Sequence, residues 1–148
     1  ITDIQAALGS SQMAKLDEFV SKRHALQKRY NSIFSNQRII CPYQSDQSYS
    51  ALHLYPIQIK YEEHSNIRDL ICKELRSAGI GVNIHYIPIH TQPFYQKFGF
   101  KSGDFPVAES YYSNCMSLPL FSSMTLIEQD KVVENLENIL HKYNLNDW

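Results

Sequence analysis

The amino-acid sequence predicts an α+β fold in which helices flank a small antiparallel sheet. Three observations lead to this class: a long stretch with helical periodicity near the N-terminus, short apolar runs bounded by turn residues, and a capped helical stretch near the C-terminus. The length of 148 residues, with 43% hydrophobic and 20% charged residues, is typical of one globular domain.

Two helices are expected in the first quarter of the chain. Residues 2–8 follow an N-cap at Thr2 or Asp3, and Gly9 is placed to close that turn. Residues 10–34 form a long amphipathic stretch, because apolar side chains recur at three- and four-residue steps with charges between them. These apolar positions are Leu16, Phe19, Val20, Leu26, Tyr30, Ile33 and Phe34.

A loop, a strand and a helix are expected next. Residues 35–50 are polar and predict a loop, whereas Ala51–Lys60 has the pattern of a strand. Pro56 cannot donate to a sheet ladder, so we expect an edge or a bulge there. A helix over residues 66–78 follows, with Ser65 as its N-cap. Its inner face and the glycine that ends it are Ile67, Leu70, Ile71, Leu75, Ala78 and Gly79.

The second half continues with short elements around a long connection. Residues 80–84 alternate apolar with small or polar side chains, which predicts a short strand. Residues 85–104 are an aromatic-rich connection interrupted by prolines and glycines. A short helix over residues 106–114 and an apolar strand around Ser117–Phe121 complete this part.

The last predicted element is a helix near the C-terminus. Thr125 and Glu128 have the spacing of a capping box, in which each side chain binds the other residue's backbone N–H. Its expected core face is Leu126, Ile127, Val133, Leu136, Ile139, Leu140 and Tyr143. The sequence contains no internal repeat or low-complexity tract.

Composition excludes several classes of function. With 14 Lys and Arg against 15 Asp and Glu, the chain lacks the concentrated positive charge of a nucleic-acid binding surface. No apolar run approaches the ~18–20 residues of a membrane span. The three cysteines form no CxxC pair, which favours a reducing compartment and a cytoplasmic location over a disulfide framework or a zinc ribbon.

The segment from His85 to Tyr95 (HYIPIHTQPFY) is the densest candidate for a functional site. It places two imidazoles and two phenols among prolines that restrict the backbone. This restriction lowers the conformational entropy lost when these side chains bind a ligand. Long connections of this kind are usually functional. The alternative is a surface loop whose aromatic rings pack back on the core.

Other chemistry is weakly supported by the residues alone. His85 and His90 could bind a metal, but HxxxxH lacks both the i, i+4 helical spacing and nearby carboxylates. Cys115 and Ser117 have no oxyanion-hole signature such as GxSxG beside them, and Cys115 is expected to be a buried apolar residue. The residues therefore predict a binding loop without a complete catalytic set.

Four segments, in order, resemble the sugar aminotransferases of the DegT/StrS type. ITDIQAALGSSQMAKLDEFVSKR resembles the segment that closes the large domain of that family, and AGIGVNIHYIPIHTQPFYQKFGF resembles its small-domain strand and substrate loop. FPVAESYYSNCMSLPLFSSMT and VVENLENIL are similar to its helix–strand segment and its closing helix. The HYIPIH form most resembles the branch that aminates UDP-linked keto-deoxy-N-acetylamino sugars for pseudaminic acid.

The resemblance implies a fold-type-I enzyme that depends on pyridoxal phosphate, takes an amino group from glutamate and gives it to a nucleotide-linked 4-keto-6-deoxy sugar. It also implies a homodimer. In this family the cofactor lysine lies on the large domain, upstream of ITDIQAALG, and the chain begins at Ile1. We therefore expect a C-terminal part without catalytic residues, cofactor-binding residues or a bound cofactor, which cannot transaminate alone.

The resemblance also assigns parts of the chain. It implies that residues 1–9 are the end of the large domain, residues 10–34 a linking helix, and residues 35–148 the small domain, with the enzyme's own N-terminal large domain as partner. His85, Tyr86, Ile87 and Pro88 would line the sugar-nucleotide side of the cleft, with His90 and Tyr95 beside it. Neither a metal site nor a partner among nucleic acids or membranes is expected.

Two other functions stay open at this stage. The chain could be a stand-alone binding or interaction module whose aromatic loop contacts a partner, or a metal-dependent hydrolase that uses His85 and His90. A C-terminal part would expose an apolar surface where the large domain is docked, especially beside Ile4 and Leu8. A stand-alone module would have no large exposed patch of this kind.

Overall fold

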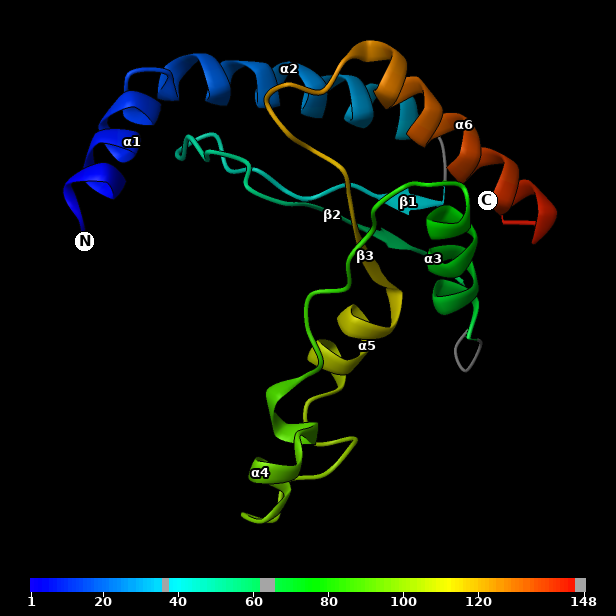
Figure 1. Cartoon of the computed structure of the whole chain (residues 1–148). Helices are drawn as coiled ribbons and strands as arrows, with labels where there is room; N and C mark the ends of the chain where they lie inside the picture. Colours follow the sequence, from blue (N-terminus) through cyan, green and yellow to red (C-terminus); the bar gives the residue numbers. More distant parts are fainter. Residues whose placement is uncertain (36–37, 62–65, 146–148) are drawn as a thin grey trace.

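A three-stranded antiparallel sheet in the order β1-β2-β3 lies at the centre of the molecule (Figure 1). The computed structural model describes residues 1–35, 38–61 and 66–145. The strands are β1 (Ile39–Ile40), β2 (Tyr55–Ile59) and β3 (Cys115–Leu118). The helices are α1 (Asp3–Met13), α2 (Leu16–Phe34), α3 (Ile67–Ser77), η1 (Ile89–Thr91), α4 (Pro93–Gln96), α5 (Pro106–Asn114) and α6 (Leu126–Lys142). The predicted α+β class with a small antiparallel sheet is confirmed.

The apolar core joins the sheet to α2, α3 and α6. Tyr55, Ile57 and Ile59 of β2 are fully buried and alternate with two half-buried residues. Tyr30 of α2 stacks on the Tyr55 ring with the ring centroids 4.9 Å apart, and its hydroxyl donates to the Pro119 carbonyl. The largest other fully buried side chains are Phe34, Ile71, Leu75, Met116, Leu136 and Leu140.

Polar contacts fix how the helices pack on one another. The buried amide of Gln129 on α6 donates to the Leu26 carbonyl of α2 over 2.8 Å, and its oxygen accepts from Arg29. At the other end of α6, the Glu74 carboxylate of α3 accepts from Lys142 and Tyr143. Because Gln129 satisfies its buried polar atoms with groups from α2, only one packing of these two helices avoids a desolvation penalty.

Pro56 lies in the central strand of the sheet, but at its own position only one side of β2 is paired, as expected for an edge there. Its partner across the sheet is Ser117, whose N–H and carbonyl exchange hydrogen bonds with Asn83 instead. On the other side, β1 pairs only with Gln58 and Ile59. Pro56 therefore lies beyond the end of β1, where its missing N–H removes no ladder hydrogen bond.

The N-terminal helices divide at a different place from the predicted one. α1 continues through Gly9 to Met13, and α2 begins at Leu16, so the helix expected over residues 10–34 is split. Gly9 adopts no positive φ, so it can continue a helix as readily as end one. The break falls at Ala14 and Lys15, where N–H groups bond to carbonyls three and four residues back in a tightened last turn.

Several other expectations need correction. Residues 80–84 make only one β-bridge, Asn83 with Ser117, although their alternation does place Ile80 and Val82 in the core. The loop expected over residues 35–50 contains β1. Leu16, Leu70, Leu126 and Ile127 lie on exposed turns instead of in the core, because helical spacing alone does not say how far a partner surface extends.

The boundaries of α3 test two expected capping residues. Gly79 ends the helix as predicted: its φ is 78° and the Ile80 N–H bonds back to the Leu75 carbonyl. Ser65, the expected N-cap, lies outside the described residues. The N-cap is Asn66, which makes no side-chain capping bond.

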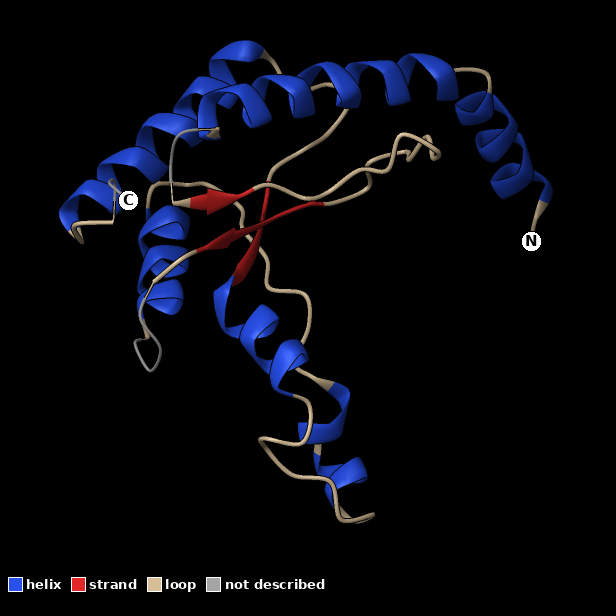
Figure 2. Ribbon diagram, turned by 180° about the vertical axis from the view of Figure 1, so that it is seen from behind, coloured by secondary structure: helices blue, strands red, loops and turns tan. Residues whose placement is uncertain are grey.

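Residues 85–114, called the arm below, extend away from the sheet on the side opposite α2 and α6 (Figure 2). α4 lies at the far end of the arm, and α5 returns from it to β3. α1 has no buried residue, with Ile4 83% and Leu8 62% exposed. In the described chain no helix is both long and apolar enough to cross a bilayer.

Two capping boxes, Thr2 with Gln5 and Thr125 with Glu128, provide a test of this architecture. Thr125 caps α6 and Thr2 caps α1 with the same reciprocal bonds, but α6 packs in the core and α1 does not. We expect Thr125→Ala to lower the free energy of unfolding by about 1 kcal/mol in urea denaturation. The matched variant Thr2→Ala should leave it unchanged, because fraying of α1 removes no buried contact. An equal loss in both variants would contradict this packing.

Candidate functional site

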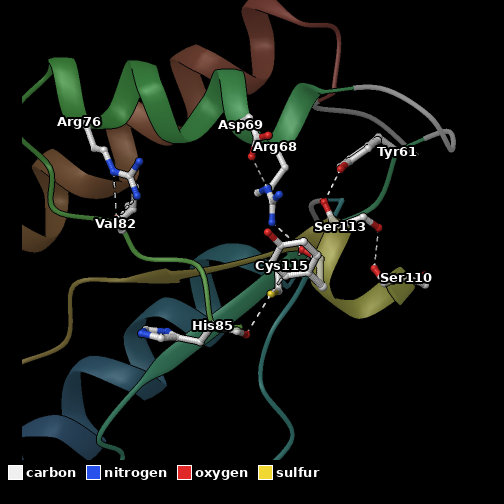
Figure 3. A network of polar contacts seen from close by, with 10 residues as sticks. Tyr61, Arg68, Asp69, Arg76, Val82, His85, Ser110, Ser113 and Cys115 are labelled. Atoms are coloured by element: carbon white, nitrogen blue, oxygen red, sulfur yellow. Dashed lines mark hydrogen bonds and ion pairs between the residues drawn. The ribbon is translucent and has the colours of Figure 1, made fainter. Parts of the chain in front are cut away.

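Two side chains bind the C-terminal end of α5: Arg68 from α3, and Tyr61 from the segment after β2 (Figure 3). Arg68 of α3, only 7% exposed, donates through Nη1 to the Tyr112 carbonyl over 2.6 Å. The Tyr61 hydroxyl donates to the Ser113 carbonyl over 2.5 Å. The last carbonyls of a helix have no intrahelical partner, so these bonds satisfy acceptors that would otherwise need water. They fix the end of α5 against the core.

Arg68 makes two further contacts that explain its burial. Its guanidinium forms an ion pair with Asp69 over 2.7 Å and lies 4.8 Å from the centre of the Tyr112 ring. A buried cation needs a partner charge or hydrogen bonds to offset the loss of water. Arg68 therefore connects α3 and α5 through a hydrogen bond and a contact with an aromatic ring.

The start of the arm is held by α3 and β3. Arg76 donates through Nε and Nη2 to the Val82 carbonyl, and the Cys115 thiol lies 3.5 Å from the His85 carbonyl (Figure 3). The His85 ring bonds through Nδ1 to the Ser117 hydroxyl over 2.9 Å, which leaves its Nε2 for another group. Cys115 is buried as expected, and burial raises the pKa of its thiol.

Glu109 of α5 holds the loop of the arm together. Its Oε1 accepts from His90 Nε2 over 2.7 Å and from the Gly103 N–H over 2.8 Å, and its Oε2 accepts from the Ser102 hydroxyl over 2.8 Å. The hydrogen bond from Ser102, followed by those from His90 and Gly103, lowers the pKa of Glu109 to about 2. The carboxylate thus stays ionised and accepts three hydrogen bonds from two segments of the arm.

The order of these groups argues against nucleophilic catalysis. A hydrolytic triad needs the imidazole between the hydroxyl and the carboxylate, so that it can take the hydroxyl proton. Here the Glu109 carboxylate lies between Ser102 and His90, and both donate to it. The cluster can hold a conformation, but it has no base placed to activate Ser102.

Two adjoining cavities open beside this cluster. The first, of about 510 Å³, is lined by five of the six predicted site residues: Tyr86, Ile87, Pro88, His90 and Tyr95. The second, of about 630 Å³, is lined by the sixth, His85, and shares Tyr86 and Pro88 with the first. The structure therefore brings all six predicted positions to one continuous surface.

The aromatic rings of the arm do not pack back on the core. Tyr86 is 75% exposed, and Ile87, Phe94 and Phe98 are also exposed, whereas His90 is buried against Phe105. None of the arm residues from Tyr86 to Phe105 belongs to the buried core cluster. This contradicts the alternative of a loop that only covers the core, and it favours a surface available to a ligand or a partner.

Sequence reasoning missed several residues of this site. Phe100, Phe105 and Ala108 complete much of the wall of the first cavity, and Glu109 binds the loop. The helix over residues 106–114 was expected, but nothing in the spacing connects Glu109 to His90, nineteen residues earlier. Only the fold brings them together.

Neither a metal site nor a cofactor lysine is found in the described chain. Among its residues, no group of three or more His, Cys, Asp or Glu lies close enough to hold a metal ion. Every lysine there is exposed, whereas a lysine that forms a Schiff base needs a desolvated pocket or a cationic neighbour. The residues of this chain therefore do not fit pyridoxal phosphate as a covalently held cofactor.

Comparison with known proteins gives a consistent set of relatives. The model of the DegT/DnrJ/EryC1/StrS aminotransferase family matches residues 1–137. The spore coat polysaccharide biosynthesis protein SpsC of Bacillus subtilis is 37% identical over 93% of this chain and 36% of its own length. A UDP-4-amino-4,6-dideoxy-N-acetyl-β-L-altrosamine transaminase of Campylobacter jejuni is 32% identical over 96% of this chain and 38% of its own length.

Solved structures resemble the fold equally well. The putative sugar aminotransferase Spr1654 from Streptococcus pneumoniae, solved in apo, PMP and PLP forms, superposes with a TM-score of 0.87 at 31% identity, over 96% of this chain and 36% of that chain. Helicobacter pylori PseC, an aminotransferase of pseudaminic acid biosynthesis, gives 0.86 at 26% identity, over 96% and 38%. The chain thus spans little more than a third of these proteins.

The lowered pKa of Glu109 predicts how the loop responds to acid. A carboxyl group whose pKa is lowered in the folded chain stabilises it above the ordinary pKa near 4.5, and loses this contribution as the pH falls through about 2. In a pH titration by NMR, the Gly103 amide proton should therefore shift with a midpoint near 2.

A matched variant separates this titration from that of neighbouring groups. In Glu109→Gln the shift of the Gly103 amide with its midpoint near 2 should be absent. A midpoint at the ordinary glutamate value in the unaltered chain would show that the carboxylate does not accept these three bonds.

Proposed function

Because the chain belongs to the DegT/DnrJ/EryC1/StrS aminotransferase family, we propose that it is the C-terminal part of a pyridoxal-phosphate-dependent enzyme that moves an amino group to a nucleotide-linked sugar. In this proposal the chain contributes substrate contacts and no catalytic residue. The observation that supports it most is the gathering of all six predicted residues around two adjoining cavities on an exposed aromatic surface.

The proposed contacts follow from the chemistry of the arm. Exposed aromatic rings offer flat apolar surfaces on which a base or the apolar face of a sugar can stack. The Tyr86 and Tyr95 hydroxyls and His85 Nε2 can bond to sugar hydroxyl and phosphate oxygens. Ile87 and Pro88 would close the apolar side, and His90 would support the wall from its buried position.

The substrate is proposed to be a UDP-linked 4-keto-6-deoxy-N-acetylamino sugar, with glutamate as amino donor. The names of the Campylobacter jejuni transaminase and of Helicobacter pylori PseC support this choice, since both concern amino sugars of that kind. SpsC, whose name refers to a spore coat polysaccharide, supports only the broader class of sugar biosynthesis.

The cofactor is proposed to be held by another part of the enzyme. The exposed lysines of this chain support that view, as does the exposed apolar side of α1, where Ile4 and Leu8 would pack against a large domain. Residues 1–9 would then complete the large domain, the helical segment over residues 10–34 would link the two, and residues 35–148 would form the small domain. A homodimer would complete the active site.

Incubation with pyridoxal phosphate tests whether a lysine of this chain holds the cofactor. After the 148-residue chain is mixed with pyridoxal phosphate and reduced with borohydride, intact-mass measurement should show no stoichiometric adduct at a single lysine, because every lysine is exposed. Free lysine in excess serves as a competitor against random surface adducts. One complete, competitor-resistant adduct would contradict the proposal.

Tyr86 offers a test of the substrate site with little effect on folding, since three-quarters of its surface is exposed. In the full-length enzyme that contains this chain, Tyr86→Ala should raise the KM for the UDP-linked keto sugar about tenfold, equivalent to about 1.4 kcal/mol of binding. The KM for glutamate should stay unchanged. Tyr43→Ala, at an 87% exposed tyrosine outside both cavities, is the matched control. Equal effects of both variants would contradict the assignment.

A further inference from the structure

One carboxylate joins its own helix, α5, to two other segments of the arm. His90 is part of η1, Ser102 and Gly103 lie in the turn before α5, and Glu109 itself belongs to α5. The chain between His90 and Ser102 contains α4. The hydrogen bonds to Glu109 therefore hold the two ends of this loop together.

The wall of the first cavity is built on the same segments. The His90 and Phe105 rings lie 4.8 Å apart between their centroids, and Phe100 lies 6.1 Å from Phe105. All three line the cavity. Gly103 has a φ of 95°, a conformation that favours glycine. The turn that it forms directs its N–H to Glu109 and lies two residues before Phe105.

Apolar burial alone cannot hold this arrangement. Phe100 and Phe105 keep two-fifths or more of their surface exposed, and neither belongs to the core cluster. Three hydrogen bonds from His90, Ser102 and Gly103 converge instead on the two side-chain oxygens of Glu109. The position of these two acceptors on α5 therefore joins the loop to that helix.

We propose that Glu109 is the positioning residue of this site: by binding His90, Ser102 and Gly103 together, it holds the loop in the form that opens the aromatic cavity to a nucleotide. The inference rests on the proposed function, because the cavity is the proposed substrate site. Glu109 would not touch the ligand, since it does not line either cavity. It would act by keeping the loop in one competent form, and a site that is competent only part of the time binds correspondingly more weakly.

Two variants of Glu109 separate geometry from charge. In Glu109→Ala both acceptor oxygens and all three hydrogen bonds are lost. In Glu109→Gln the amide oxygen can still accept from His90 and Gly103, and the amide nitrogen can donate to the Ser102 hydroxyl, which accepts as well as donates. The control variant is Glu134→Ala on α6, an exposed glutamate far from the arm.

The test uses the 148-residue chain and two measurements. NMR reports the nuclear Overhauser contact between the His90 and Phe105 rings and the shift of the Gly103 amide. Titration with uridine diphosphate gives the dissociation constant. We expect Glu109→Ala to lose the ring contact and to bind uridine diphosphate about tenfold more weakly, as for a loop competent a tenth of the time. Glu109→Gln and Glu134→Ala should keep both values, and circular dichroism should show the core helices intact in all variants.

Each outcome decides the inference. Retention of the ring contact and of the affinity in Glu109→Ala would overturn it. Loss of both in Glu109→Gln as well would also overturn it, because charge and not position would then control the site. If the unaltered chain does not bind uridine diphosphate, the proposed substrate site fails, whereas loss of the ring contact in Glu109→Ala with rescue in Glu109→Gln would still support the positioning role.

Discussion

The hydrogen bond from Arg68 to the Tyr112 carbonyl holds the last turn of α5 against α3, and α5 carries the loop of the proposed site. α5 is nine residues long and contains no buried residue, so its own packing cannot orient it. The buried guanidinium holds its last turn against α3, with Tyr61 beside it. Glu109, about one turn earlier on the same helix, then transfers that orientation to the loop.

The same local signal has different consequences at the two ends of the molecule. Thr2 and Thr125 each complete a capping box, and both helices begin where the sequence indicates. Only α6 adds buried residues and the Gln129 contact to α2, so only there does the cap stabilise the core. Local chemistry therefore fixes where a helix starts, whereas tertiary packing decides how much that start contributes to stability.

The sequence predicts well those features that depend on neighbouring residues. The α+β class, the Thr125 cap, the Gly79 end of α3 and the helix over residues 106–114 all follow from spacing, capping and turn chemistry. The break at Ala14 and the single bridge at Asn83 could not be predicted, because they depend on which surface each segment meets.

The same limit applies to the site. The HYIPIH segment predicts a candidate binding loop, because aromatic and imidazole groups among prolines are a local pattern. Glu109 has no such pattern: on the sequence it is one glutamate on a short helix, and its role exists only once His90, Ser102 and Gly103 lie around it.

The division between a buried core and a hydrogen-bonded arm has a consequence for recognition. The core is held by apolar burial, which is lost only when the domain unfolds, whereas the arm keeps Tyr86, Phe94 and Phe98 exposed and is held by a few polar contacts. Exposed aromatic rings in an ordered loop can be buried by a ligand or by another part of the enzyme at little cost in conformational entropy. The arm is joined to α3 through α5 and Arg68 and adds no residue between Tyr86 and Phe105 to the core cluster. The loop that lines the cavity can therefore change conformation while the sheet and its helices stay folded.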